Sequence, residues 1–151
     1  MESTSPGAVI DLLVIGYGNT LRSDDSVGPR VAEAIAALKL PGVRALSCNL
    51  LTPELAETMS RVRRVVFVDA SVEPQAEVEM KKLFAAESSQ IFAHAADPRT
   101  LLAMARDIIG HVPEAWCLSI PVKNLDIGEE LSAMAKRGLD IAIKLIRELV
   151  R

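Results

Sequence analysis

Short aliphatic runs that alternate with stretches of helical periodicity limit this chain to few folds. The runs at 9–15, 65–68 and 115–120 contain consecutive apolar residues, as buried strands do. The full set of expected strands is 9–15, 42–46, 65–68, 77–83 and 115–120, and the expected helices are 26–38, 52–60, 98–109 and 129–150. Strands that alternate with helices form mostly parallel sheets covered on both faces. We therefore predict an α/β fold of phosphorylase/hydrolase-like type, a three-layer αβα sandwich around a mostly parallel five-stranded sheet.

Length and composition fit one domain with an aliphatic core. The 151 residues are 50% hydrophobic but only 3% aromatic, so Leu, Ile, Val, Ala and Met must fill the interior. Residues 1–8 are polar, and we expect them to form a disordered tail before a single domain at 9–151. No apolar stripe is left over once the helices are assigned to the core, which predicts a monomer.

The charges and apolar runs argue against two classes of partner. Seventeen basic and twenty acidic residues give a net charge of −3 with no basic block, so no nucleic-acid partner is expected. No apolar run approaches the roughly 20 residues of a membrane span, and the N-terminus does not resemble a signal peptide. We expect a cytoplasmic protein. Cys48 and Cys117 form no Cys-x-x-Cys motif and are expected to be small buried core residues.

Polar residues stand where two of the expected strands end. Parallel sheets bind ligands beyond the carboxyl ends of their strands, which points to 16–25, 69–73 and 121–128. Asp24 and Asp25 precede the first helix, where one acid is enough to cap it; Asp25 has the better claim to point inward. Asp69 follows a buried strand, where a carboxylate either caps the next turn or needs a partner such as a metal.

One histidine adds a third possible ligand. His94 lies in a loop before a helix, whereas His111 follows Gly110 in a helix-ending turn and is expected to be structural. Two carboxylates and one imidazole can hold a divalent ion and leave positions open for water or substrate. Such a set suits nickel, zinc, iron or manganese without choosing between them.

Two other kinds of site remain as alternatives at this point. Gly16 and Gly18 begin like a dinucleotide-binding loop, but Leu21 stands where the third glycine belongs. A nucleotide-binding or non-catalytic α/β module is therefore the competing interpretation. No Gly-x-Ser-x-Gly motif indicates a serine nucleophile, and Cys48 has no obvious base nearby.

Several segments, in order, resemble the endopeptidases that mature the large subunit of nickel-iron hydrogenases. The segment 16–28 resembles the family's opening Gly-x-Gly-Asn…Asp-Asp/Glu…Gly motif, and Leu-Thr-Pro-Glu-Leu at 51–55 with Val-Phe-Val-Asp-Ala at 66–70 resembles its middle block. His94 stands where the family has its loop histidine, and 120–132 resembles its last block. The chain departs from many relatives at 48–50, where Cys-Asn-Leu replaces a Gly-Gly pair.

The resemblance implies an aspartic-type, nickel-recognising endopeptidase. Carried across, Asp25, Asp69 and His94 are the metal ligands and the catalytic residues. The implied substrate is a hydrogenase large-subunit precursor that already carries Ni²⁺ and loses its C-terminal peptide. With the metal polarising the carbonyl or activating water, Asp25 or Asp69 is the implied general base. A peptidase of the same fold with an unrelated substrate, such as a relative of the spore-protein protease, is a further alternative.

Overall fold

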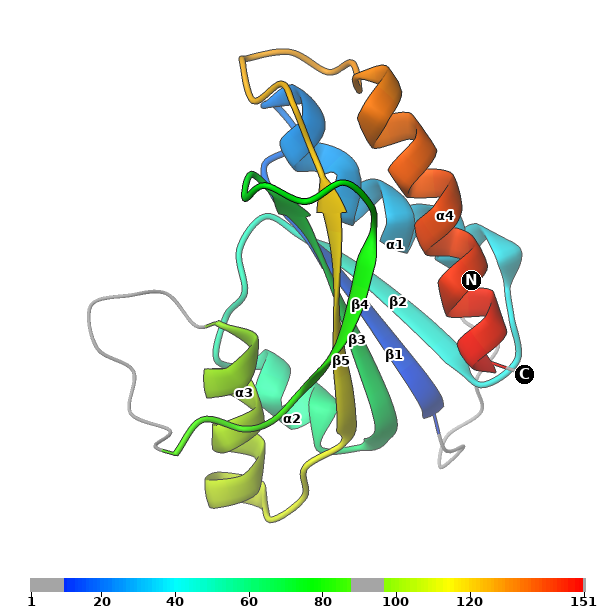
Figure 1. The fold of residues 1–151 in the computed structure, drawn as a ribbon. Coiled ribbons are helices and arrows are strands. Elements are labelled where there is room, and N and C mark those ends of the chain that lie inside the picture. Colours follow the sequence, from blue (N-terminus) through cyan, green and yellow to red (C-terminus); the bar gives the residue numbers. More distant parts are fainter. Residues whose placement is uncertain (1–9, 88–96, 151) are drawn as a thin grey trace.

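The computed structural model describes residues 10–87 and 97–150 as a five-stranded sheet with helices on both faces (Figure 1). The predicted tail at 1–8 lies outside the described residues. The strands are β1 (Ile10–Tyr17), β2 (Val43–Cys48), β3 (Val62–Ser71), β4 (Glu79–Leu83) and β5 (Glu114–Pro121). The helices are α1 (Val27–Leu38), α2 (Leu55–Met59), α3 (Pro98–Met104) and α4 (Ala133–Val150), with short turns η1 (Ser23–Ser26) and η2 (Ala105–Ile109).

The sheet has the strand order β2-β1-β3-β5-β4. Strands β2, β1, β3 and β5 are parallel to one another. Strand β4 runs antiparallel to β5 at the outer edge of the sheet. At the centre, Val14 of β1 lies between Ala45 of β2 and Val66 of β3. The prediction of a mostly parallel five-stranded sheet is confirmed.

Two apolar clusters, one on each face of the sheet, form the core. On one face Val31 of α1 and Ile146 of α4 pack with Val14 of β1. On the other, Met59 of α2 and Leu101 of α3 pack with alternate residues of β1 and β3. Because successive strand residues point to opposite faces and both faces are covered, the strands are hydrophobic without interruption. This arrangement confirms the predicted three-layer sandwich (Figure 1).

Some predicted helix boundaries are wrong. The terminal helix begins at Ala133 rather than residue 129, because Ser132 and the residues before it are bonded to the loop after β1. The helix expected at 52–60 is shorter: α2 starts only at Leu55, and the carbonyl of Thr52 accepts from the Leu55 N–H in the preceding turn. No helix among the described residues has the length and apolarity needed to cross a membrane.

Two glycines let α1 begin directly against the sheet. A Cβ atom on Gly16 would lie 1.9 Å from the carbonyl oxygen of Gly28, and one on Gly28 would lie 2.6 Å from the carbonyl oxygen of Val68. Real side chains do not tolerate such contacts with backbone. The close approach therefore sets where η1 and α1 lie relative to the ends of β1 and β3.

We expect Gly16→Ala to destabilise the protein far more than Gly42→Ala. Gly42 has a positive φ of 72°, but the nearest neighbour of a Cβ atom there would be 3.6 Å away, so alanine costs only about 1–2 kcal/mol. Urea unfolding of both variants measures the difference. Equal losses in the two variants would show that the contact between β1 and α1 is not as tight as described.

Candidate active site

The loops after β1, β2, β3 and β5 meet at the carboxyl edge of the sheet (Figure 1). Asp25 lies in η1 after β1, and Asp69 lies near the end of the neighbouring strand β3. The charge of Asp25 raises the pKa of Asp69, so the two carboxylates act on one another. The structure thus brings together two of the three predicted site residues. His94 lies outside the described residues.

Asp25 is held by its own loop. The backbone N–H of Asn19 donates to Oδ2 of Asp25 at 2.7 Å. Gly18 has a φ of 150°, and a Cβ atom there would lie 2.0 Å from the carbonyl oxygen of Asp25. The loop consequently folds closely around Asp25, which remains half-buried with its carboxylate near the strand ends.

The side chain of Asp69 has a pKa shifted toward neutrality. Burial raises its pKa to about 6, and the charge of Asp25 adds to this effect. Hydrogen bonds from the Tyr17 hydroxyl and the Ala70 N–H oppose the rise. Burial and Asp69 together raise the pKa of the Tyr17 phenol, which therefore stays a proton donor. A carboxyl group with a pKa near neutrality suits general acid–base chemistry.

Neither cysteine is suited to act as a nucleophile. Burial, aided by the charge of Asp69, raises the pKa of Cys117 to about 11, although Lys81 opposes the shift. Burial also raises the pKa of Cys48. Both are free thiols of intermediate burial, rather than buried core residues as predicted. Their thiols are protonated at neutral pH, and nucleophilicity belongs to the thiolate.

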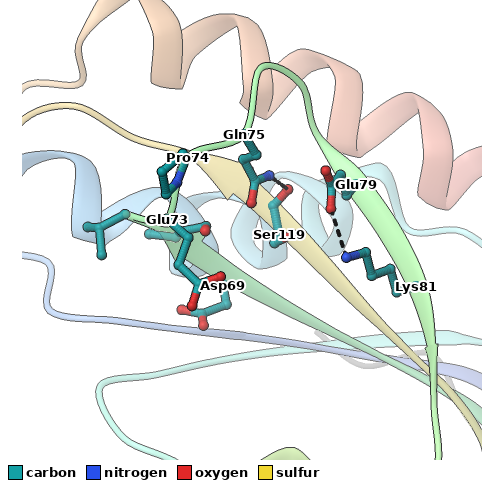
Figure 2. A pocket seen from close by; sticks show the side chains of 10 residues that line it. Asp69, Glu73, Pro74, Gln75, Glu79, Lys81 and Ser119 are labelled. Carbon is teal, nitrogen blue, oxygen red and sulfur yellow. Dashed lines mark hydrogen bonds and ion pairs between the residues drawn. The ribbon is translucent and has the colours of Figure 1, made fainter.

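A polar cavity of about 470 Å³ adjoins Asp69. Asp69, Ser119 and Glu79 lie in register across β3, β5 and β4 and contribute to its lining. Figure 2 shows Asp69 and Glu73 at one end of the cavity and Glu79, paired with Lys81 at 3.2 Å, at the other. The cavity therefore offers space for polar groups directly beside the Asp69 carboxylate.

Asp24 has a structural role that the sequence did not predict. Its side chain is fully buried, and Oδ2 accepts hydrogen bonds from the N–H groups of Lys123 (2.9 Å) and Asn124 (3.0 Å). Ser132 donates from its N–H to Oδ1 and from Oγ to Oδ2, both at 2.7 Å. The prediction that one of the two acids caps the first helix is wrong, because Ser26 precedes α1 and makes no side-chain cap bond.

The glycine loop is closed to a phosphate. The N–H of Gly18 donates to the carbonyl of Cys48 at 3.1 Å, and that of Asn19 donates to Asp25. Phosphate-binding loops need such N–H groups free and their glycine surfaces open. Here backbone oxygens of Asp25 and Gly28 cover those surfaces. This geometry argues against the nucleotide-binding alternative.

The described residues do not complete a metal centre. Residues 10–87 and 97–150 contain no group of three His, Cys, Asp or Glu side chains placed to hold a metal ion. His111 lies apart from the carboxylates, where its Nε2 atom is 2.9 Å from the carbonyl oxygen of Val62. That contact agrees with the structural role expected for His111. The predicted three-ligand set thus depends on His94.

Solved structures share this fold over nearly the whole chain. A hydrogenase 2 maturation peptidase from a Thaumarchaeota archaeon is 24% identical with a TM-score of 0.70, covering 93% of this chain and 97% of its own. The [NiFe] hydrogenase maturation protease HycI from Thermococcus kodakarensis KOD1 is 23% identical with a TM-score of 0.71, covering 94% and 93%. The hydrogenase maturating endopeptidase HybD from E. coli is 20% identical with a TM-score of 0.70, covering 90% and 89%.

Comparison of the amino-acid sequence alone finds no relatives. No family model matches the chain, and no curated protein matches it either. At these identities the structural likeness establishes the shared α/β fold.

We expect Asp24→Asn to lower the free energy of unfolding by about 3 kcal/mol. The amide NH2 of asparagine is a donor, so it cannot replace the carboxylate oxygen that accepts hydrogen bonds from buried donors. Burial alone would raise the pKa of Asp24, but its hydrogen bonds lower it below 3.8. Its stabilising contribution is therefore present above the unfolded pKa and lost as the pH falls through the folded pKa. Denaturant titrations at pH 7 and pH 3 measure both effects; a variant as stable as the parent at pH 7 would contradict the assignment.

Two substitutions should move the pKa of Asp69 in opposite directions. Asp25→Asn removes a like charge and lowers the pKa, whereas Tyr17→Phe removes a hydrogen bond to the carboxylate and raises it. Carbon-13 NMR titration of the Asp69 carboxyl group reads both shifts. Asp126→Asn, an exposed change on the loop after β5, serves as the control and should leave the value in place.

Proposed function

We propose that this chain is an endopeptidase that removes the C-terminal peptide from the large-subunit precursor of a nickel-iron hydrogenase. The observation that carries the proposal is the pairing of Asp25 with Asp69 at the carboxyl edge of the sheet, in a fold shared with named maturation proteases. The sequence motifs around both residues, and His94, support the same assignment. The nickel ion belongs to the substrate, which presents it.

The two carboxylates have the chemistry to receive such an ion. They repel one another, and no ion pair among the described residues neutralises either of them. A divalent cation relieves that repulsion, and oxygen donors with one imidazole leave coordination positions open. Asp25, Asp69 and His94 would hold the ion of the incoming precursor, so nickel serves recognition.

Asp69 is the residue best suited to activate water. Its raised pKa makes it a stronger base than an exposed carboxylate, while the Tyr17 hydroxyl keeps it oriented. The ionised form takes a proton from water as the oxygen attacks the scissile carbonyl carbon, and the protonated form returns that proton to the leaving amine. Asp25, fixed by the Asn19 N–H, completes the carboxylate pair of an aspartic-type peptidase.

The cavity beside Asp69 accommodates the chain that flanks the scissile bond. Its volume of about 470 Å³ and its lining by the loop at 70–75, Glu79, Lys81 and Ser119 suit an extended polar peptide. The proposal further places the enzyme in the cytoplasm as a monomer, acting on a protein substrate rather than on nucleic acid or a membrane.

Incubation with a hydrogenase large-subunit precursor, with and without nickel, tests the function. We expect tail removal, read as a loss of C-terminal mass, only from the nickel-loaded precursor. Asp25→Asn, Asp69→Asn and His94→Ala should each reduce the rate by at least about 100-fold while leaving the fold intact, because each removes a ligand or a base.

Two controls separate loss of chemistry from loss of structure. Asp140→Asn changes an exposed acid of α4, and His111→Gln changes a histidine that lies apart from the carboxylates. Both should process the precursor at the parental rate. Normal processing by all three site variants would reject the proposed site, and no processing by the parental protein would favour an unrelated substrate.

A further inference from the structure

Leu21 and Ile127 lie next to one another at the carboxyl edge of the sheet, although they are 106 positions apart in the sequence. Arg22 and Gly128, the residues that follow them, form a parallel bridge, and the Gly128 N–H donates to the carbonyl oxygen of Leu21 at 2.9 Å. Leu21 is 63% exposed and Ile127 is 91% exposed. The pair presents aliphatic side chains to solvent, where they contribute little to the core.

The two loops that carry this pair are firmly held. Ser23 donates from its N–H to the Gly128 carbonyl at 2.8 Å and from Oγ to the Asp126 carbonyl at 2.7 Å. The Arg22 guanidinium donates to the Leu125 carbonyl at 3.1 Å. The buried Asp24 carboxylate accepts hydrogen bonds from the N–H groups of Lys123 and Asn124, in the loop that carries Ile127. Apolar side chains on such a pre-organised support lose little conformational entropy when a partner covers them.

The pair belongs to a set of four exposed aliphatic residues in the loops at the carboxyl edge of the sheet. Each loop that follows a parallel strand presents one of them. They are Leu21 after β1, Leu50 after β2 (63% exposed), Val72 after β3 (69%) and Ile127 after β5. These four loops meet at the edge that holds Asp25 and Asp69, so a folded protein that covers the two carboxylates comes close to these residues.

We propose that the Leu21–Ile127 pair docks the folded part of the protein substrate, through an apolar patch beside the chain that is cut. The inference rests on the proposed function and names the surface by which that substrate is selected. The Leu21 N–H donates to Oδ1 of Asn19 at 2.9 Å, and the Asn19 N–H donates to Oδ2 of Asp25 at 2.7 Å, so the pair adjoins the Asp25 carboxylate. A folded protein that delivers a peptide bond to Asp25 therefore reaches the pair. The cavity at Asp69, by contrast, is lined from β3, β4, β5 and the loop at 70–75, and a short peptide can occupy it without touching Leu21 or Ile127.

The test compares the full chain with two double variants. Leu21→Ser with Ile127→Ser removes the pair; Leu38→Ser with Ile108→Ser removes two exposed aliphatic residues that lie at the C-terminal ends of α1 and η2. The rate of tail removal is measured against the concentration of nickel-loaded precursor, and calorimetry measures binding of the nickel-free precursor. We expect the pair variant to raise KM and Kd by at least about tenfold with kcat little changed, as truncated interface anchors do. The control variant should match the parent.

The possible results distinguish the docking surface from the proposed function. Unchanged KM and Kd in the pair variant, or a loss confined to kcat, would overturn the docking surface while leaving the proposed function standing. Parental protein that binds the precursor through the pair but cuts nothing would remove the proposed function and keep the docking surface. Sedimentation that shows self-association of the parent, abolished in the pair variant with precursor binding unaffected, would assign the pair to a second copy of this chain and overturn the proposal.

Discussion

The buried carboxylate of Asp24 is the interaction on which the carboxyl edge of the sheet depends. It accepts four hydrogen bonds from Lys123, Asn124 and Ser132, and so joins the loop after the first strand to the loop after the last. Removing a charge from water is costly, and only a full set of donors offsets that cost. Here the set is complete. One ionised side chain thereby fixes the loop that carries Asp25 and the loop that carries Ile127.

Asp24 and Asp69, two acids at this edge of the sheet, meet opposite demands of stability and chemistry. Asp24 has every oxygen bonded and a lowered pKa, whereas Asp69 is partly buried beside the like charge of Asp25 and has a pKa raised to about 6. Burying a repelling pair destabilises a fold, so a sequence selected for stability alone would replace one member. The repulsion lies at the edge where parallel sheets bind their ligands, as is typical of functional sites.

The sheet and two of its acids were predictable from sequence because both follow from local pattern. Aliphatic runs specify the parallel strands, and strand ends place Asp25 and Asp69 at one edge. The role of Asp24 was not predictable, because its partners are about a hundred residues away in the sequence. They donate mainly through backbone N–H groups, which every residue type except proline has, so no particular side chain reveals the contact. The start of α4 was misplaced for the same reason: helical periodicity extends to residue 129, but tertiary bonds hold the residues up to Ser132 in the loop.

The glycine loop shows how one motif can serve two incompatible kinds of site. Gly16 and Gly18 are the residues a phosphate loop would use, yet their open faces are filled by backbone oxygens of Gly28 and Asp25. Oxygens in those positions repel an anion, and the loop N–H groups already have acceptors. The same loop carries Asp25, whose negative charge lies close enough to Asp69 to raise its pKa. Two neighbouring carboxylates disfavour an anionic ligand such as a nucleotide, whereas the proposed substrate would bring a metal ion that relieves their repulsion.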